Sequence, residues 1–129
     1  MDKEQEKTQL KNFRAIGSAL DDLKEFPEDV QDVMGYALEL AQRGKKHPNA
    51  KPLHGFSGAG VLEIVDDFDG DTYRAIYTVR FENFVFLLHS FQKKSKHGIA
   101  TPKQDIELIN KRLKRAKEQY LEEKGGNNG

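Results

Sequence analysis

The chain contains no cysteine and no tryptophan, so disulfide bonds and thiolate metal ligands are excluded. The four histidines, His47, His54, His89 and His97, lack the short regular spacing of a metal-binding motif. We therefore expect neither a metal nor another cofactor. No stretch approaches the roughly 20 consecutive apolar residues of a membrane-spanning helix. The charged first eleven residues lack the apolar region of a secretory signal, so we expect a cytoplasmic protein.

Charge is abundant but unevenly distributed along the chain. The net charge is zero, yet residues 1–71 hold 9 Lys and Arg against 15 Asp and Glu, whereas residues 72–129 hold 12 against 6. Two windows, 43–60 and 83–104, contain cations and no acid. If folding brings these windows together, they form a positively charged groove without carboxylates that would attract phosphates. The alternative is that each lysine only solvates a loop.

The hydrophobic pattern predicts one small α+β domain. Apolar residues at helical spacing predict helices over 18–26 and 28–44, joined at Pro27, and a last helix that begins after Thr101 and carries the apolar stripe Ile106, Ile109, Leu113, Ala116 and Tyr120. Strands are expected over 12–16, 61–65, 72–81 and 84–91. We expect the N-terminal helical hairpin to pack on an antiparallel-rich sheet of about four strands. Residues 1–11 are interpreted as a flexible arm, 12–123 as the domain and 124–129 as a flexible tail.

The dipeptide Asp69-Gly70 predicts a two-residue hairpin turn that fixes the register of its two strands. This register places Leu62 opposite Tyr77 and Val65 opposite Arg74. Glu63 would then lie diagonal to Arg74. Arg74 therefore has two interpretations: it holds a phosphate through its planar fork, or it forms a structural ion pair on the sheet.

The candidate site residues follow from the chemistry of RNA cleavage without a metal. That reaction needs a base for the ribose 2′-OH, cations near the phosphate and an acid for the leaving oxygen. The candidate catalytic residues are Arg74, Lys93, Lys94 and His54, and the candidate RNA-binding residues are Lys45, Lys46, Lys51, Phe91, Lys96 and His97. His54, in the loop 44–60, has the alternative interpretation of an ordinary surface side chain, which is the commoner case for a lone loop histidine. Phe91 could be core, and we expect His89 to be a buried structural histidine.

Several segments resemble a known family. The runs KPLHGFSGAGVLEI and GDTYRAIYTVRFENFVFLLHSFQKKSKHGIATPKQDIELINKRL are similar to the RelE/ParE toxin superfamily, and most closely to the phage-derived, HigB-like branch of type II toxin–antitoxin toxins. The shared motifs are a KPLxG loop, a YRAIY strand, and an FxKKS segment followed by a TP helix start. The likeness covers roughly residues 13–120. It implies a RelE-like fold.

The resemblance also implies a function. A toxin of this kind is a ribosome-dependent, metal-independent endoribonuclease that cuts mRNA and inhibits translation. Its implied partners are the ribosome with its mRNA and a cognate antitoxin, expected to be a helix-turn-helix protein in a hetero-oligomer. By position, Arg74 matches a phosphate-contacting strand arginine, Lys93 and Lys94 match a basic strand end, and Lys51 and His54 lie in the preceding basic loop. The chain departs from relatives with a C-terminal tyrosine or an Asp-Tyr-His ending.

Two other functions remain open at this point. ParE-type relatives share the fold but bind DNA gyrase and are not nucleases, and fold alone does not separate the two activities. The chain could also be an inactive member that serves as a regulatory or antitoxin-binding module. The basic loop and the KKSK cluster favour RNA over gyrase.

Overall fold

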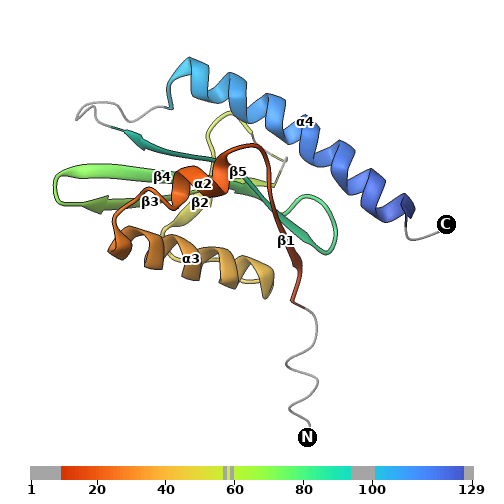
Figure 1. Ribbon diagram of the computed structural model, residues 1–129, viewed down its shortest axis with the longest axis horizontal. Helices are drawn as coiled ribbons and strands as arrows, with labels where there is room; N and C mark the ends of the chain where they lie inside the picture. The colour runs from red at the N-terminus through yellow and green to blue at the C-terminus, as the bar shows by residue number, and fades with distance from the viewer. Residues whose placement is uncertain (1–9, 57, 59, 94–100, 127–129) are drawn as a thin grey trace, which may run out of the picture.

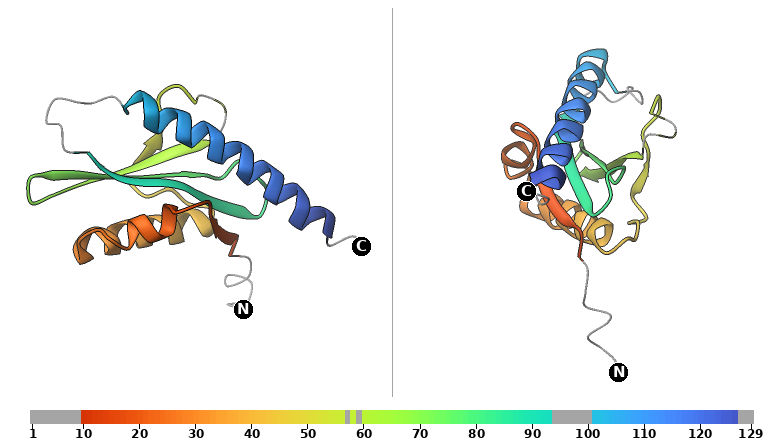
Figure 2. Two further views of the ribbon diagram at one scale, coloured as in Figure 1. Left: turned by 45° about the horizontal axis from the view of Figure 1, so that its top comes forward. Right: turned by 90° about the vertical axis from the view of Figure 1, so that its right-hand side faces the viewer.

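The protein is a three-layer α+β domain in which helices cover both faces of one five-stranded sheet (Figure 1). The computed structural model describes residues 10–56, 58, 60–93 and 101–126. The elements in chain order are β1 (Asn12–Ala15), α2 (Ala19–Leu23), α3 (Glu28–Gln42), β2 (Ala50–Pro52), β3 (Val61–Phe68), β4 (Asp71–Thr78), β5 (Phe84–Lys93) and α4 (Lys103–Gly126). The strand order is β1-β5-β4-β3-β2. Helices α2 and α3 lie on one face and α4 on the other (Figure 2).

The hairpin of β3 and β4 has the predicted turn and register. Asp69 and Gly70 have φ angles of 53° and 86°, the positive values that a type I′ turn requires. Leu62 pairs with Tyr77, and Val65 pairs with Arg74. The predicted register is confirmed, because a two-residue turn leaves the strands no freedom to slip.

Strand β5 changes the face of its side chains at a bulge. Ile76 pairs with His89, whereas the next residue of β4, Tyr77, pairs with Leu87, so Leu88 is the extra residue. A bulge interrupts the strict alternation of faces along a strand. Leu88 packs in the core under α4, and His89 also reaches α4. Lys93, the last residue of β5, lies on this same face.

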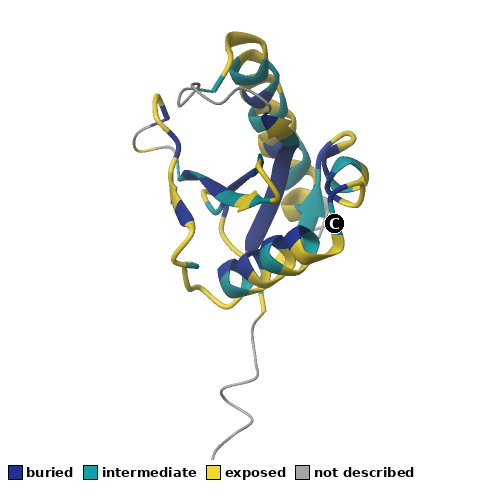
Figure 3. Ribbon diagram, turned by 90° about the vertical axis from the view of Figure 1, so that its left-hand side faces the viewer, coloured by how far each residue is buried: buried dark blue, intermediate teal, exposed yellow. Residues whose placement is uncertain are grey.

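Each face of the sheet has its own hydrophobic core, and the central strands β4 and β5 between the two cores are largely buried (Figure 3). The core under α3 includes Met34, Ile64 and Tyr77. On the other face, α4 packs through the predicted stripe of Ile106, Ile109, Leu113, Ala116 and Tyr120. That prediction is confirmed.

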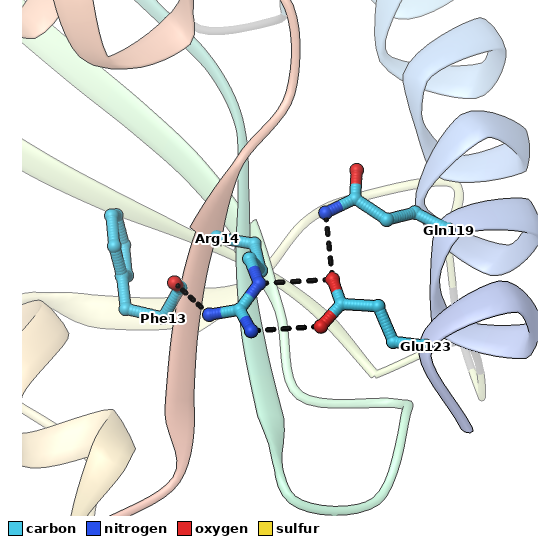
Figure 4. A network of polar contacts seen from close by, with 4 residues as sticks. All are labelled: Phe13, Arg14, Gln119 and Glu123. Atoms are coloured by element: carbon cyan, nitrogen blue, oxygen red, sulfur yellow. Dashed lines mark hydrogen bonds and ion pairs between the residues drawn. The ribbon is translucent and has the colours of Figure 1, made fainter. Parts of the chain in front are cut away.

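The C-terminal half of α4 is attached to the edge strand β1 by a polar network (Figure 4). Arg14 Nε donates to Glu123 Oε2 at 2.9 Å, and Arg14 Nη2 donates to Glu123 Oε1 at 2.7 Å. Gln119 Nε2 donates a further hydrogen bond to the same carboxylate. The bond from Arg14 lowers the pKa of Glu123, and the bond from Gln119 lowers it further. This fork fixes the position of α4 relative to the sheet.

Two differences from the sequence-based expectation concern the edges of the elements. The connection 44–60 contains a fifth strand, β2, which pairs with β3 through Ala50 and Ile64. Three residues are too few to show a periodic pattern, and the proline is tolerated because β2 is an edge strand. The first helix is shorter than expected and ends at Leu23. No described helix is long and apolar enough to cross a membrane.

Candidate active site

A buried ion pair forms the centre of a charged cluster on the α4 face of the sheet. Arg74 on β4 is 7% exposed, and its Nη1 donates to Glu63 Oε2 on β3 at 2.6 Å. Glu63 pairs directly with Ile76, so it lies diagonal to Arg74. The structural ion pair, one of the two interpretations of Arg74, is thus confirmed. Its role toward a phosphate stays a prediction.

Lys93 stands next to this pair at the end of β5. It pairs with Thr72, two residues before Arg74, and is 7% exposed. Burial lowers the pKa of Lys93, and the positive charge of Arg74 lowers it further, whereas Glu63 and Asp105 act in the opposite direction. A lysine of lowered pKa releases its proton more readily than an ordinary surface lysine.

His89 and Asp105 connect the same strand to the start of α4. The distance between His89 Nε2 and Asp105 Oδ1 is 2.7 Å, and the imidazole stacks on the Phe91 ring at 4.7 Å between centroids. His89 Nδ1 is buried and has no hydrogen-bond partner among the described residues. His89 is therefore buried, as expected, but its bond to Asp105 was not predicted. The available signal was that Asp105 lies one helical turn before the buried Ile109.

Lys51 extends the cluster to the edge of the sheet. It pairs directly with Glu63, so the two side chains share a face. The row Lys51, Glu63, Arg74 and Lys93 thus crosses β2, β3, β4 and β5. Lys51 is exposed, as is His54 in the turn after β2. Three of the predicted cations are brought to one face.

The expectation that this face lacks carboxylates is wrong. Glu63 contacts Arg74, and Asp105 lies close enough to raise the pKa of Lys93 against the lowering effect of burial. Both acids come from outside the two acid-free windows. The physical reason is that a buried cation needs a counter-charge, which neighbouring elements supply.

Of the other predicted RNA-binding residues, Lys45 and Lys46 do not join the row. Lys45 and Lys46 line a cavity of about 210 Å³ with Leu62 and Tyr77, on the α3 face. Lys46 Nζ also donates to the Ala50 carbonyl at 2.9 Å. Phe91 is half-buried, pairs with Arg74 and stacks on His89. Lys94, Lys96 and His97 lie outside the described residues.

A metal site is not formed by the described part of the chain. No group of three or more His, Asp or Glu side chains within it is arranged to hold a metal ion. The polar side chains of the candidate site are instead a guanidinium, ammonium groups, an imidazole and two carboxylates. These groups can bind an anion and transfer protons.

The chain is similar to one protein family and to a chain of known structure. The family model described as phage-derived protein Gp49-like (DUF891) matches residues 21–114. Among solved structures, a chain of the toxin–antitoxin complex RelBE2 from Mycobacterium tuberculosis is similar, with 22% sequence identity and a TM-score of 0.41. The match covers 70% of this chain and 99% of that chain. No curated protein sequence matches.

Proposed function

The chain belongs to the phage-derived Gp49-like family, and from that premise and the geometry of the cluster we propose that it is the toxin of a type II toxin–antitoxin system. Its activity is that of a ribosome-dependent, metal-independent endoribonuclease that cuts mRNA and stops translation. One observation carries the proposal: Lys51, Arg74 and Lys93, from three separate segments, lie in one row on a single face of the sheet. A rigid sheet holds such a row in place.

The row supplies the electrostatic part of the reaction. When the 2′ oxygen of a ribose attacks the adjacent phosphorus, negative charge grows on the phosphate oxygens. Arg74 and Lys51 stabilise that charge. Glu63 fixes the guanidinium plane of Arg74 through the 2.6 Å bond, and the phosphate takes the position of a second anion against the same guanidinium. The P–O5′ bond then breaks and leaves a 2′,3′-cyclic phosphate and a 5′ hydroxyl.

Two side chains supply proton transfer. The lowered pKa of Lys93 suits it to donate a proton to the leaving 5′ oxygen. His54 lies in the turn that follows Lys51, and its imidazole takes the proton of the 2′-OH as the general base. Lys94 extends the basic end of β5 in sequence and adds a further cation.

The proposal includes partners and a place of action. The sequence resemblance implies a cognate antitoxin that silences the toxin, expected to be a helix-turn-helix protein. The substrate is mRNA on a translating ribosome, so the toxin acts in the cytoplasm. Phe91 lies opposite Arg74, and in this proposal its ring contacts an unstacked base of the bound mRNA.

Expression of the chain alone in bacteria tests the proposal against the two other functions. The expected result is growth arrest with new mRNA 5′ ends inside reading frames. Growth arrest with gyrase-linked DNA breaks and intact mRNA would show a ParE-like gyrase-binding toxin instead. No effect on growth would identify a regulatory or antitoxin-binding module without nuclease activity.

A further inference from the structure

A second basic groove lies between α4 and the segment that follows β4. It has a volume of about 540 Å³ and is lined by Arg80, Phe81, Asn110, Lys111, Leu113, Lys114 and Lys117. Four of these residues are cations, and none of the described residues that line the groove is acidic. None of the ion pairs between described residues involves Lys111, Lys114 or Lys117. The groove therefore keeps its positive charge.

The two flanks of α4 differ in what they contact. On one flank, Arg112 Nη1 donates to the Leu88 carbonyl, and Glu123 pairs with Arg14 of β1. The lysines of the groove lie on the other flank, beside Arg80. The first flank therefore attaches the helix to the sheet, whereas the second presents its cations to solvent.

The groove opens on the same side of the sheet as the candidate active site. Its apolar residues Phe81 and Leu113 pack in the same core as Ile76. Ile76 lies two residues after Arg74 on β4 and therefore faces the same way. Arg80 is six residues from Arg74, a distance of at most about 20 Å along the chain. One extended RNA strand can therefore contact both Arg74 and Arg80.

We propose that this groove binds the phosphodiester backbone of the RNA segment that continues from the bond held at Arg74. Lys111, Lys114 and Lys117 contact successive phosphates, and Arg80 connects them to the cluster. The contacts are independent of base identity, because the aromatic ring in the groove, Phe81, is buried against Phe86 and Tyr120 and offers no face for stacking. The inference rests on the proposed function and adds the path of its substrate.

Salt dependence of RNA binding tests the groove directly. The probe is a fluorescein-labelled single-stranded RNA with 2′-O-methyl riboses, which cannot be cleaved through the 2′ oxygen. Affinity is measured by fluorescence anisotropy over a series of salt concentrations. The full-length chain is compared with the triple variant Lys111→Gln, Lys114→Gln and Lys117→Gln.

A matched control removes the same charge from exposed sites outside the groove, through Lys24→Gln, Arg43→Gln and Arg115→Gln. Loss of three phosphate contacts should reduce the slope of log K against log salt by about 2, since each contact on a single strand contributes about 0.7. The control should keep the wild-type slope. Thermal unfolding followed by circular dichroism verifies that both triple variants are folded.

Equal slopes for the groove variant and the control would overturn the inference. Loss of affinity for an acidic antitoxin helix with an unchanged RNA slope would also overturn it, because the groove would then bind protein. Failure of the proposed function looks different: the wild type would bind the RNA with the predicted slope and cut no mRNA. If the wild type cuts mRNA but the groove variant binds RNA with the wild-type salt slope, the proposed function would stand and only the proposed RNA path would be wrong.

Discussion

Arg74 and Glu63 form a buried ion pair across β3 and β4, with 2.6 Å between Nη1 and Oε2. The stability of the fold and the proposed chemistry both depend on this guanidinium, because Glu63 both neutralises Arg74 and orients it. A buried pair contributes little compared with apolar packing, but loss of one partner leaves a charge without compensation. Variants at this position must therefore be interpreted with their stability known.

Substitution Arg74→Ala is expected to lower the free energy of unfolding by about 3 to 5 kcal/mol, because it leaves Glu63 buried and charged. Urea denaturation followed by circular dichroism measures this change. Arg115→Ala is the control, since Arg115 is exposed on α4 and its loss should change the free energy by less than about 0.5 kcal/mol. Equal stability of the two variants would show that the pair is not maintained in solution.

Lys93 is expected to make the free energy of unfolding depend on pH in the alkaline range. Its pKa is lowered in the folded state, so the unfolded chain binds more protons between the folded pKa and the ordinary value of 10.5. The free energy of unfolding should therefore rise with pH across that window through this group. Lys93→Met should remove this rise, as measured by urea titrations at a series of pH values. An unchanged pH slope in the variant would mean that Lys93 is solvated.

The contact between His89 and Asp105 is expected to stabilise the first turn of α4. Asp105→Asn should weaken the 2.7 Å bond and raise amide hydrogen exchange in residues 103–110. The expected cost is about 1.5 to 3 kcal/mol, the range for a hydrogen bond to a charged group. Glu107→Gln removes a nearby charge at an exposed position and controls for the helix dipole. Similar exchange in both variants would contradict this function of Asp105.

The fork between Arg14 and Glu123 is expected to hold the C-terminal half of α4 against β1 until the pH falls low enough to protonate Glu123. Its pKa is lowered in the folded state, so the contribution is present above the ordinary value of 4.5 and is lost as the pH falls through the folded pKa. Glu123→Gln should raise hydrogen exchange in residues 118–126 at neutral pH. Glu122→Gln, an exposed neighbour, should not. Equal protection would mean that packing alone holds the helix.

Local patterns predicted much of the fold. The Asp69-Gly70 turn determined the register of β3 and β4, and the spacing of apolar residues identified the packed face of α4. The resemblance to a phage-derived family is likewise confirmed by the match over residues 21–114. The turn and the apolar stripe depend on residues that are close together in sequence.

Tertiary neighbours were harder to predict. The bulge at Leu88 brings His89 to the α4 face, and no turn residue or proline marks it. Asp105 directly follows the window 83–104 in sequence, and it joins the site only because α4 packs on β5. The prediction of a groove without carboxylates, made from composition, was wrong for the same reason. Counter-charges for buried cations come from whichever elements pack beside them.

The most direct test of the central claim is the mapping of mRNA 5′ ends after incubation of the purified chain with a defined message, with and without ribosomes. Cuts should occur in translated codons only when ribosomes are present. Arg74→Lys, which keeps the charge opposite Glu63 but loses the planar fork, should reduce the cutting rate by about 10²-fold. Lys51→Gln should also slow cutting, whereas Lys24→Gln should not. An intact message under all conditions, or equal cutting by wild type and Arg74→Lys, would contradict the account.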